Sequence, residues 1–139
     1  TNTGTVPATD KLLLLVEDNP HLAHAMTTMV ESFGSTVIHA HTADEALSIL
    51  AEIELVPDAM LIDFQLGTGR DGTALLEEIT RQYGPIPAAI VSAERTRFLR
   101  DRCKALGVQL IAKPVEQARL KELFVEMFAP SAPQKIASS

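Results

Sequence analysis

Short apolar runs in this sequence end in, or lead directly to, side chains that could support phosphoryl chemistry. These side chains are Glu17 and Asp18, Asp63, Ser92, and Lys113. If the runs are neighbouring strands of a parallel sheet, their carboxyl ends meet at one edge, which is where such folds bind ligands. Three carboxylates held there at ~4 Å would repel one another by roughly 1 kcal/mol per pair in water and about 4 kcal/mol near a protein surface. The pattern therefore predicts a bound cation.

Oxygen ligands favour Mg²⁺, Mn²⁺ or Ca²⁺. Mg²⁺ suits phosphoryl transfer best, with water and a substrate phosphate completing its coordination shell, and Mn²⁺ is the alternative. A carboxylate can itself be the nucleophile and then becomes an aspartyl phosphate. Asp63 follows the central run and is the expected nucleophile, with the metal bridging Asp18, Asp63 and the phosphoryl group. Lys113 would supply a second positive charge, and Ser92 would supply a hydrogen-bond donor.

Strands and helices must alternate to bring these groups together. Short apolar stretches typical of strands buried on both faces occur at residues 11–16, 36–40, 59–63, 88–92 and 109–112. Between and after them, apolar residues recur at helical spacing over residues 22–33, 43–50, 75–83, 98–106 and 120–127. Strict alternation predicts an α/β fold with a parallel sheet, helices on both faces and right-handed crossovers.

Local signals support these boundaries. Thr42-x-x-Glu45 is a capping box that opens the second helical segment, and Gly107 follows the fourth. In that fourth segment, the apolar stripe consists of Phe98, Leu99, Cys103 and Leu106, and we expect Cys103 in the core.

Composition limits the class of protein. The 139 residues, with 46% hydrophobic and 22% charged residues, predict one globular domain, which we place at residues 11–129 between flexible tails at 1–10 and 130–139. The net charge of -6 argues against a nucleic-acid surface. The single cysteine fits a reducing compartment, and no apolar run reaches the ~18 residues of a membrane span. These features predict a cytoplasmic domain, and they leave its oligomeric state open.

The stretches LLLLVEDNP, AMLIDFQL and AAIVSAE, and the step Lys113-Pro114, resemble in order, type and spacing the receiver domains of two-component response regulators. The resemblance covers roughly residues 10 to 129. It implies a flavodoxin-like (βα)5 fold, doubly wound around a five-stranded parallel sheet in the order 2-1-3-4-5. It also implies phosphotransfer from a phosphohistidine, on a histidine kinase or a histidine phosphotransfer protein, to an aspartate with Mg²⁺. Such a domain promotes its own phosphorylation and dephosphorylation and turns over no separate substrate.

The resemblance also assigns roles around the metal. By this match Asp63 is the phosphoacceptor, and Glu17 and Asp18 are the acidic pair. Asp18 would bind the metal directly and Glu17 largely through water, while the backbone carbonyl of Gln65 would complete the protein ligands.

Further roles concern the switch between states. Ser92 would be the switch hydroxyl, and Lys113 would be the salt-bridging lysine, followed by a cis peptide at Pro114. The sequence departs from the family at Leu110, where an aromatic residue is common, so the usual aromatic movement coupled to Ser92 cannot occur. The glycine-rich loop after Asp63 is similar to that of receivers fused to the C-terminus of hybrid sensor histidine kinases.

Three other functions fit parts of the sequence. Gly67 to Gly72 form a G-x-G-x-x-G pattern after a strand, as in dinucleotide sites, but a pyrophosphate there would face Asp63 and Asp71 without compensation. A haloacid-dehalogenase-like phosphatase uses similar residues, but it places its nucleophile on the first strand. An interaction module that signals without phosphorylation is favoured by Leu110 and opposed by the complete set of acids, Ser92 and Lys113.

Two surface features complete the predictions. The pairs His21 and His24, and His39 and His41, have no cysteine or third ligand nearby, so we expect surface histidines rather than a metal site. A basic cluster at Arg95, Arg97 and Arg100 stands out in an acidic protein, and we interpret it as either a solvated face or a docking surface for an acidic partner.

Overall fold

Five strands and five helices alternate along the part of the chain that the computed structural model describes, residues 11–67 and 71–128. The strands are β1 (Leu12–Val16), β2 (Thr36–Ala40), β3 (Ala59–Asp63), β4 (Ala88–Ser92) and β5 (Gln109–Ala112). The helices are α1 (Pro20–Ser32), α2 (Ala43–Ile53), α3 (Gly72–Tyr83), α4 (Arg97–Leu106) and α5 (Gln117–Phe128). The expected tails and the expected domain end at residue 129 lie outside the described residues.

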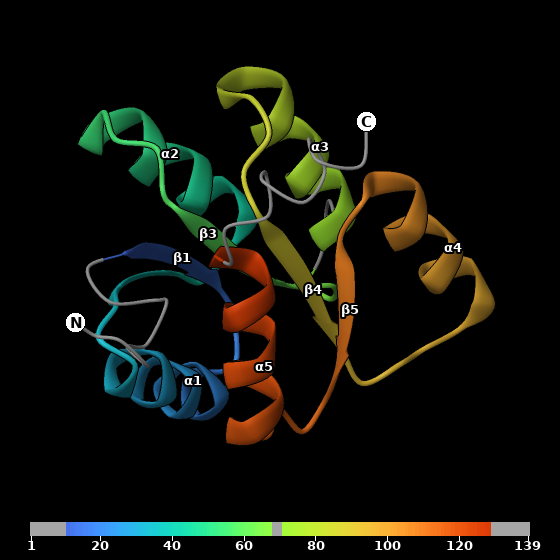
Figure 1. The fold of residues 1–139 in the computed structure, drawn as a ribbon. Coiled ribbons are helices and arrows are strands. Elements are labelled where there is room, and N and C mark those ends of the chain that lie inside the picture. The colour runs from blue at the N-terminus through green and yellow to red at the C-terminus, as the bar shows by residue number, and fades with distance from the viewer. Residues whose placement is uncertain (1–10, 68–70, 129–139) are drawn as a thin grey trace, which may run out of the picture.

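The strands form one parallel sheet in the order β2-β1-β3-β4-β5, with helices on both faces (Figure 1). This confirms the predicted flavodoxin-like fold and strand order. The expected strands agree with the observed ones, except that β1 begins at Leu12 rather than at Lys11. Among the described residues, no helix has the length and apolar character needed to cross a membrane.

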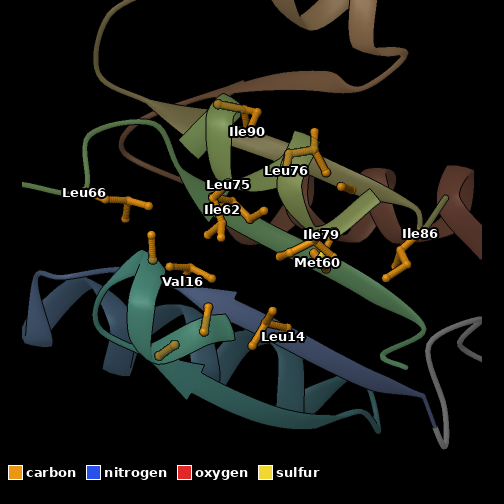
Figure 2. Close-up of a cluster of buried hydrophobic side chains, with 14 of the residues drawn as sticks. Leu14, Val16, Met60, Ile62, Leu66, Leu75, Leu76, Ile79, Ile86 and Ile90 are labelled. Atoms are coloured by element: carbon orange, nitrogen blue, oxygen red, sulfur yellow. The ribbon is translucent and has the colours of Figure 1, made fainter. Parts of the chain in front are cut away.

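Alternate residues of each central strand serve two separate cores. Leu13 and Leu15 of β1 face the layer formed by α1 and α5, whereas Leu14 and Val16 face α2, α3 and α4. Figure 2 shows the second of these cores, in which Ile62 of β3 lies among side chains of the sheet and α3. Burial of each large aliphatic side chain contributes roughly 1.5–3 kcal/mol, so both layers hold the sheet in place.

The register of the sheet places the predicted site residues together at the carboxyl edge of the strands. Val16 is paired with Ile62, so the residues that follow β1 lie beside Asp63 at the end of β3. Ser92 is paired with Ala112, which precedes Lys113. The order of the strands also reverses between β1 and β3, and this is the point at which open α/β sheets form a ligand-binding crevice.

Phe98 does not share the environment of the other residues of the predicted apolar stripe of α4. Its side chain is 71% exposed, whereas Leu99 and Cys103 are buried. Residues that are adjacent on a helix point about 100° apart, and α4 packs on the sheet along the narrower line of Leu99, Cys103 and Leu106, which leaves Phe98 outside it. The burial of Cys103 is confirmed, and desolvation raises the pKa of its thiol.

The capping box at α2 is confirmed in one direction only. The Thr42 hydroxyl accepts the Glu45 backbone N–H at 3.0 Å. The Glu45 carboxylate accepts the backbone N–H of His41 at 2.6 Å, one residue before the cap, and also contacts the His41 ring. These bonds hold the pKa of the Glu45 carboxyl below its ordinary value. The helix stop is also confirmed, because Gly107 adopts the left-handed conformation with φ of 73°.

The different environments of Phe98 and Leu99 predict unequal losses of stability when each side chain is truncated. Leu99→Ala should lower the free energy of unfolding by about 2–5 kcal/mol, because it opens a cavity beneath α4. Phe98→Ala should change it by less than about 0.5 kcal/mol. Urea denaturation of both variants measures the difference, and an equal loss in the two variants would contradict the observed orientation of α4.

Candidate functional site

Three carboxylates converge beyond the ends of β1 and β3. Ligand oxygens of Glu17, Asp18 and Asp63 all lie within 4.8 Å of one another. Glu17 and Asp63 are only 1% and 3% exposed, whereas Asp18 is exposed at the rim. The structure therefore brings together the acidic residues that the sequence suggested as metal ligands.

Lys113 reaches this group from the end of β5. Its Nζ lies 3.2 Å from Asp63 Oδ1 and 3.6 Å from Glu17 Oε1. The Lys113-Pro114 peptide is cis, as predicted. The ammonium thus contacts two buried carboxylates that originate from different strands.

These groups line a hollow of about 520 Å³ at the edge of the sheet. Its lining consists of Glu17, Asp18, Asn19, Asp63, Phe64, Gln65, Leu66, Gly67, Asp71 and Lys113. Gln65 is exposed, and its backbone N–H points to Asp63 Oδ1 at 3.4 Å. The role of its carbonyl as a metal ligand stays a prediction.

Positive charge is scarce at this site. The pKa of Glu17 is raised from 4.5 to about 7, mainly because the carboxyl is buried and next because the Asp63 carboxylate is adjacent. The Asn19 backbone N–H, at 3.2 Å, and the Lys113 ammonium oppose this increase without cancelling it. A group of hard oxygen donors with too little positive charge fits a divalent cation such as Mg²⁺.

Ser92 is buried at the end of β4, but it does not line the hollow. Its hydroxyl accepts the backbone N–H of Glu94 at 2.9 Å, while its carbonyl accepts the backbone N–H of Lys113 at 3.0 Å. The hydroxyl oxygen is therefore next to the site, and it already accepts one hydrogen bond. Its predicted contact with a phosphoryl group would require a new bond.

The start of α3 forms part of the same hollow, which sequence reasoning did not identify. Asp71 caps this helix, and its Oδ1 accepts the Ala74 backbone N–H at 2.9 Å. Gly72 lies so close to β3 that an added Cβ would be 2.3 Å from the carbonyl oxygen of Asp63. The only local signals were an aspartate before a helical stripe and a glycine after it.

This geometry argues against a dinucleotide at the glycine-rich loop. Gly72 donates its backbone N–H to the Phe64 carbonyl, and Asp71 accepts that of Ala74, so these donors of the α3 N-terminus are already paired. Gly67 has φ of 79°, a left-handed conformation that favours glycine, so this residue allows the chain to turn after the end of β3. Residues 68–70 of the loop lie outside the described residues.

The four histidines differ in their surroundings. His21 and His24 are exposed, as expected. His39 is half-buried, which sequence reasoning missed, and its Nε2 lies 2.8 Å from the Glu17 carbonyl oxygen. Its ring also packs on His41, with centroids 4.3 Å apart. His39 thus supports the main chain at the acidic pair.

Comparisons with known proteins agree with this geometry. Residues 13–125 match the family described as Response regulator receiver domain. The chain is 31% identical over 109 residues to the phyllosphere-induced regulator PhyR of Methylorubrum extorquens, covering 78% of this chain and 40% of that protein. It is 32% identical over 112 residues to the sensor protein TorS of Escherichia coli K12, covering 80% of this chain and 12% of that protein. The chain thus spans less than half the length of these curated relatives.

The fold is shared with solved structures. The non-phosphorylated HemR receiver domain from Leptospira biflexa superposes with a TM-score of 0.78 at 24% identity, covering 89% of this chain and 98% of that chain.

The raised pKa of Glu17 predicts how stability depends on pH in the metal-free protein. Between pH 4.5 and about 7, the folded protein holds a proton on Glu17 that the unfolded chain has lost. The contribution of this group to stability is thus fully present below pH 4.5 and is lost as pH rises through about 7. Urea midpoints measured with a chelator should show a smaller decline over this window for Glu17→Gln than for the parent. Parallel curves would contradict the proposed burial of charge.

Proposed function

The chain belongs to the response regulator receiver domain family, and from this membership we propose that Asp63 accepts a phosphoryl group from a phosphohistidine. The donor would be a histidine kinase or a histidine phosphotransfer protein. The observation that carries the proposal is the position of the Asp63 carboxylate, which is buried at the edge of a parallel sheet and is contacted by Lys113 Nζ at 3.2 Å.

The proposed reaction is a direct phosphoryl transfer. A carboxylate oxygen of Asp63 forms a bond to phosphorus while the P–N bond of the phosphohistidine breaks, and the imidazole nitrogen keeps the electron pair. The reaction needs little covalent chemistry from the protein, so positioning and charge stabilisation supply most of the rate. Lys113 supports this step because its ammonium is already beside the attacking carboxylate and can contact the incoming phosphoryl oxygens.

The residues that would hold Mg²⁺ are Asp18, Asp63 and, largely through water, Glu17, together with the backbone carbonyl of Gln65. When bound, Mg²⁺, or Mn²⁺ in its place, neutralises negative charge on the transferring group. The Asn19 backbone N–H fixes the Glu17 carboxyl in the hollow. The charge deficit at Glu17 and Asp63 supports this assignment independently of family membership.

Ser92 is the proposed switch hydroxyl. Its hydroxyl would donate to a phosphoryl oxygen, and because the same hydroxyl accepts the Glu94 N–H, a movement of Ser92 toward the phosphoryl group would alter the loop between β4 and α4. Leu110 on β5 is half-buried and lacks an aromatic ring, so the response of this face must differ from an aromatic exchange. Leu110 is also the feature that supports the alternative function, an interaction module independent of phosphorylation.

The loop before α4 and its first turns form the surface proposed for an acidic partner. Arg95, Arg97 and Arg100 are all exposed there, and Phe98 is exposed among them. An exposed aromatic side chain beside several guanidinium groups is a composition enriched in the centres of protein interfaces. Partner switching would then consist of a change at this surface after phosphorylation.

Phosphorylation can be tested with acetyl phosphate and Mg²⁺ by intact mass. The parent should gain one phosphoryl group, and Asp63→Asn should gain none. Asp44→Asn, which removes an exposed carboxylate on α2, is the matched control and should behave as the parent does. A chelator should abolish the adduct. Absence of an adduct from both acetyl phosphate and a phosphorylated kinase would contradict the proposal and favour the phosphorylation-independent module.

The partner surface predicts salt-dependent binding. Arg97→Glu combined with Arg100→Glu should weaken association with the phosphodonor or output protein by at least about tenfold at low salt, and less at high salt, because screening reduces charge attraction. Arg81→Glu on α3, also an exposed arginine, is the control. Titration of purified partner measures the effect, and equal affinities for both sets of variants would exclude this surface.

A further inference from the structure

A chain of hydrogen bonds connects the hollow to α4. Thr73 is 1% exposed, and its hydroxyl donates to Asp71 Oδ1 at 2.6 Å. The Thr73 hydroxyl oxygen in turn accepts the Nε–H of Arg102, on α4, at 3.1 Å. Arg102 also places Nη2 2.9 Å from Glu77 Oε1 on α3. A threonine hydroxyl has one donor and two acceptor positions, so Thr73 can serve both partners at once.

The other end of these hydrogen bonds lies in the hollow that contains Asp63. Asp71 lines this hollow together with Asp63. Between Asp71 and Thr73, Gly72 donates its backbone N–H to the Phe64 carbonyl at 2.8 Å, and a Cβ added to it would lie 2.3 Å from the carbonyl oxygen of Asp63. The start of α3 is therefore set closely against the end of β3, and a change of charge at Asp63 acts on Asp71 across the hollow that they share.

We propose that Thr73 is a positioning residue that couples the charge at Asp63 to α4 through Asp71 and Arg102. Negative charge in the hollow strengthens the series of hydrogen bonds that ends at the Arg102 guanidinium. Each added negative charge increases the attraction of this cation toward the start of α3. Phosphorylation would replace the single charge of the Asp63 carboxylate by the roughly two negative charges of an acyl phosphate, and this net gain of about one charge would tighten the link. Loss of charge at Asp63 would loosen it.

The consequence concerns the basic surface on α4. Arg102 lies on the same helix as Arg97 and Arg100, so a tighter link to α3 restrains the element that presents them. This regulatory meaning rests on the proposed function, whereas the coupling itself does not. The coupling predicts that α4 responds to the charge at Asp63 even without a phosphoryl group.

A double-mutant cycle distinguishes this coupling from a simple clamp, in which Thr73 holds α3 and α4 together but does not transmit the charge at Asp63. The cycle uses the full chain as parent, Asp63→Asn, Thr73→Val, and the double variant, and it measures amide hydrogen exchange across Leu99 to Leu106. Asp63→Asn should accelerate exchange in α4 about three- to tenfold in the parent background, a typical range for coupled residues. In the Thr73→Val background, the same change should accelerate it by less than about twofold.

Matched variants identify the groups responsible. Thr73→Ser keeps the hydroxyl and should restore the response to Asp63→Asn. Arg102→Gln should abolish the response, whereas Lys104→Gln, which removes an exposed charge from the same helix, should preserve it. A clamp without coupling would raise exchange in Thr73→Val and leave the effect of Asp63→Asn unchanged, and this result would overturn the proposal. The outcome is independent of the acetyl phosphate test, so either proposal can fail while the other stands.

Discussion

The site depends on the burial of negative charge beside too few cations. Glu17 and Asp63 are almost completely buried, Asp18 stands at the rim, and the ammonium of Lys113 contacts both buried carboxylates. A proton on Glu17 relieves this deficit in the metal-free protein, which is why its pKa lies near 7. A divalent cation would relieve the same deficit more completely. The same charge imbalance thus favours a proton on Glu17 and supports the proposed binding of a divalent cation.

The scaffold tolerates this imbalance because the rest of the interior is apolar and firmly packed. The two cores on either side of the sheet hold β1 and β3 in register, and the register sets Asp63 beside the residues that follow Val16. Gly72 extends the constraint to α3, whose first turn rests directly on the end of β3. The stability of the cores thus offsets the cost of like charges at one edge of the sheet.

Helix α4 has a different character from the other elements around the sheet. Its contact with the core is a narrow line that includes Leu99 and Cys103, and the rest of its surface is basic with Phe98 exposed. A helix with few buried contacts costs little to shift, so polar bonds at its edge have a large influence on its position. The bonds from Arg102 to Thr73 and Glu77 are of this kind, and they join α4 to α3, the helix whose start lies beside the end of β3.

The sequence by itself determined the fold class, the strand order through family resemblance, and the acids and lysine that gather at the sheet edge. The fold class and the gathering of the acids and the lysine follow from hydrophobic periodicity and from the rule that parallel strands share one carboxyl edge. Both depend only on the order of residues along the chain. Only the tertiary structure decided that His39 supports the Glu17 carbonyl, that Phe98 points to solvent, and that Arg102 reaches Thr73, 29 positions earlier. Such contacts depend on how separate elements are rotated and set against one another. That arrangement is chosen by packing of the whole domain rather than by any local pattern.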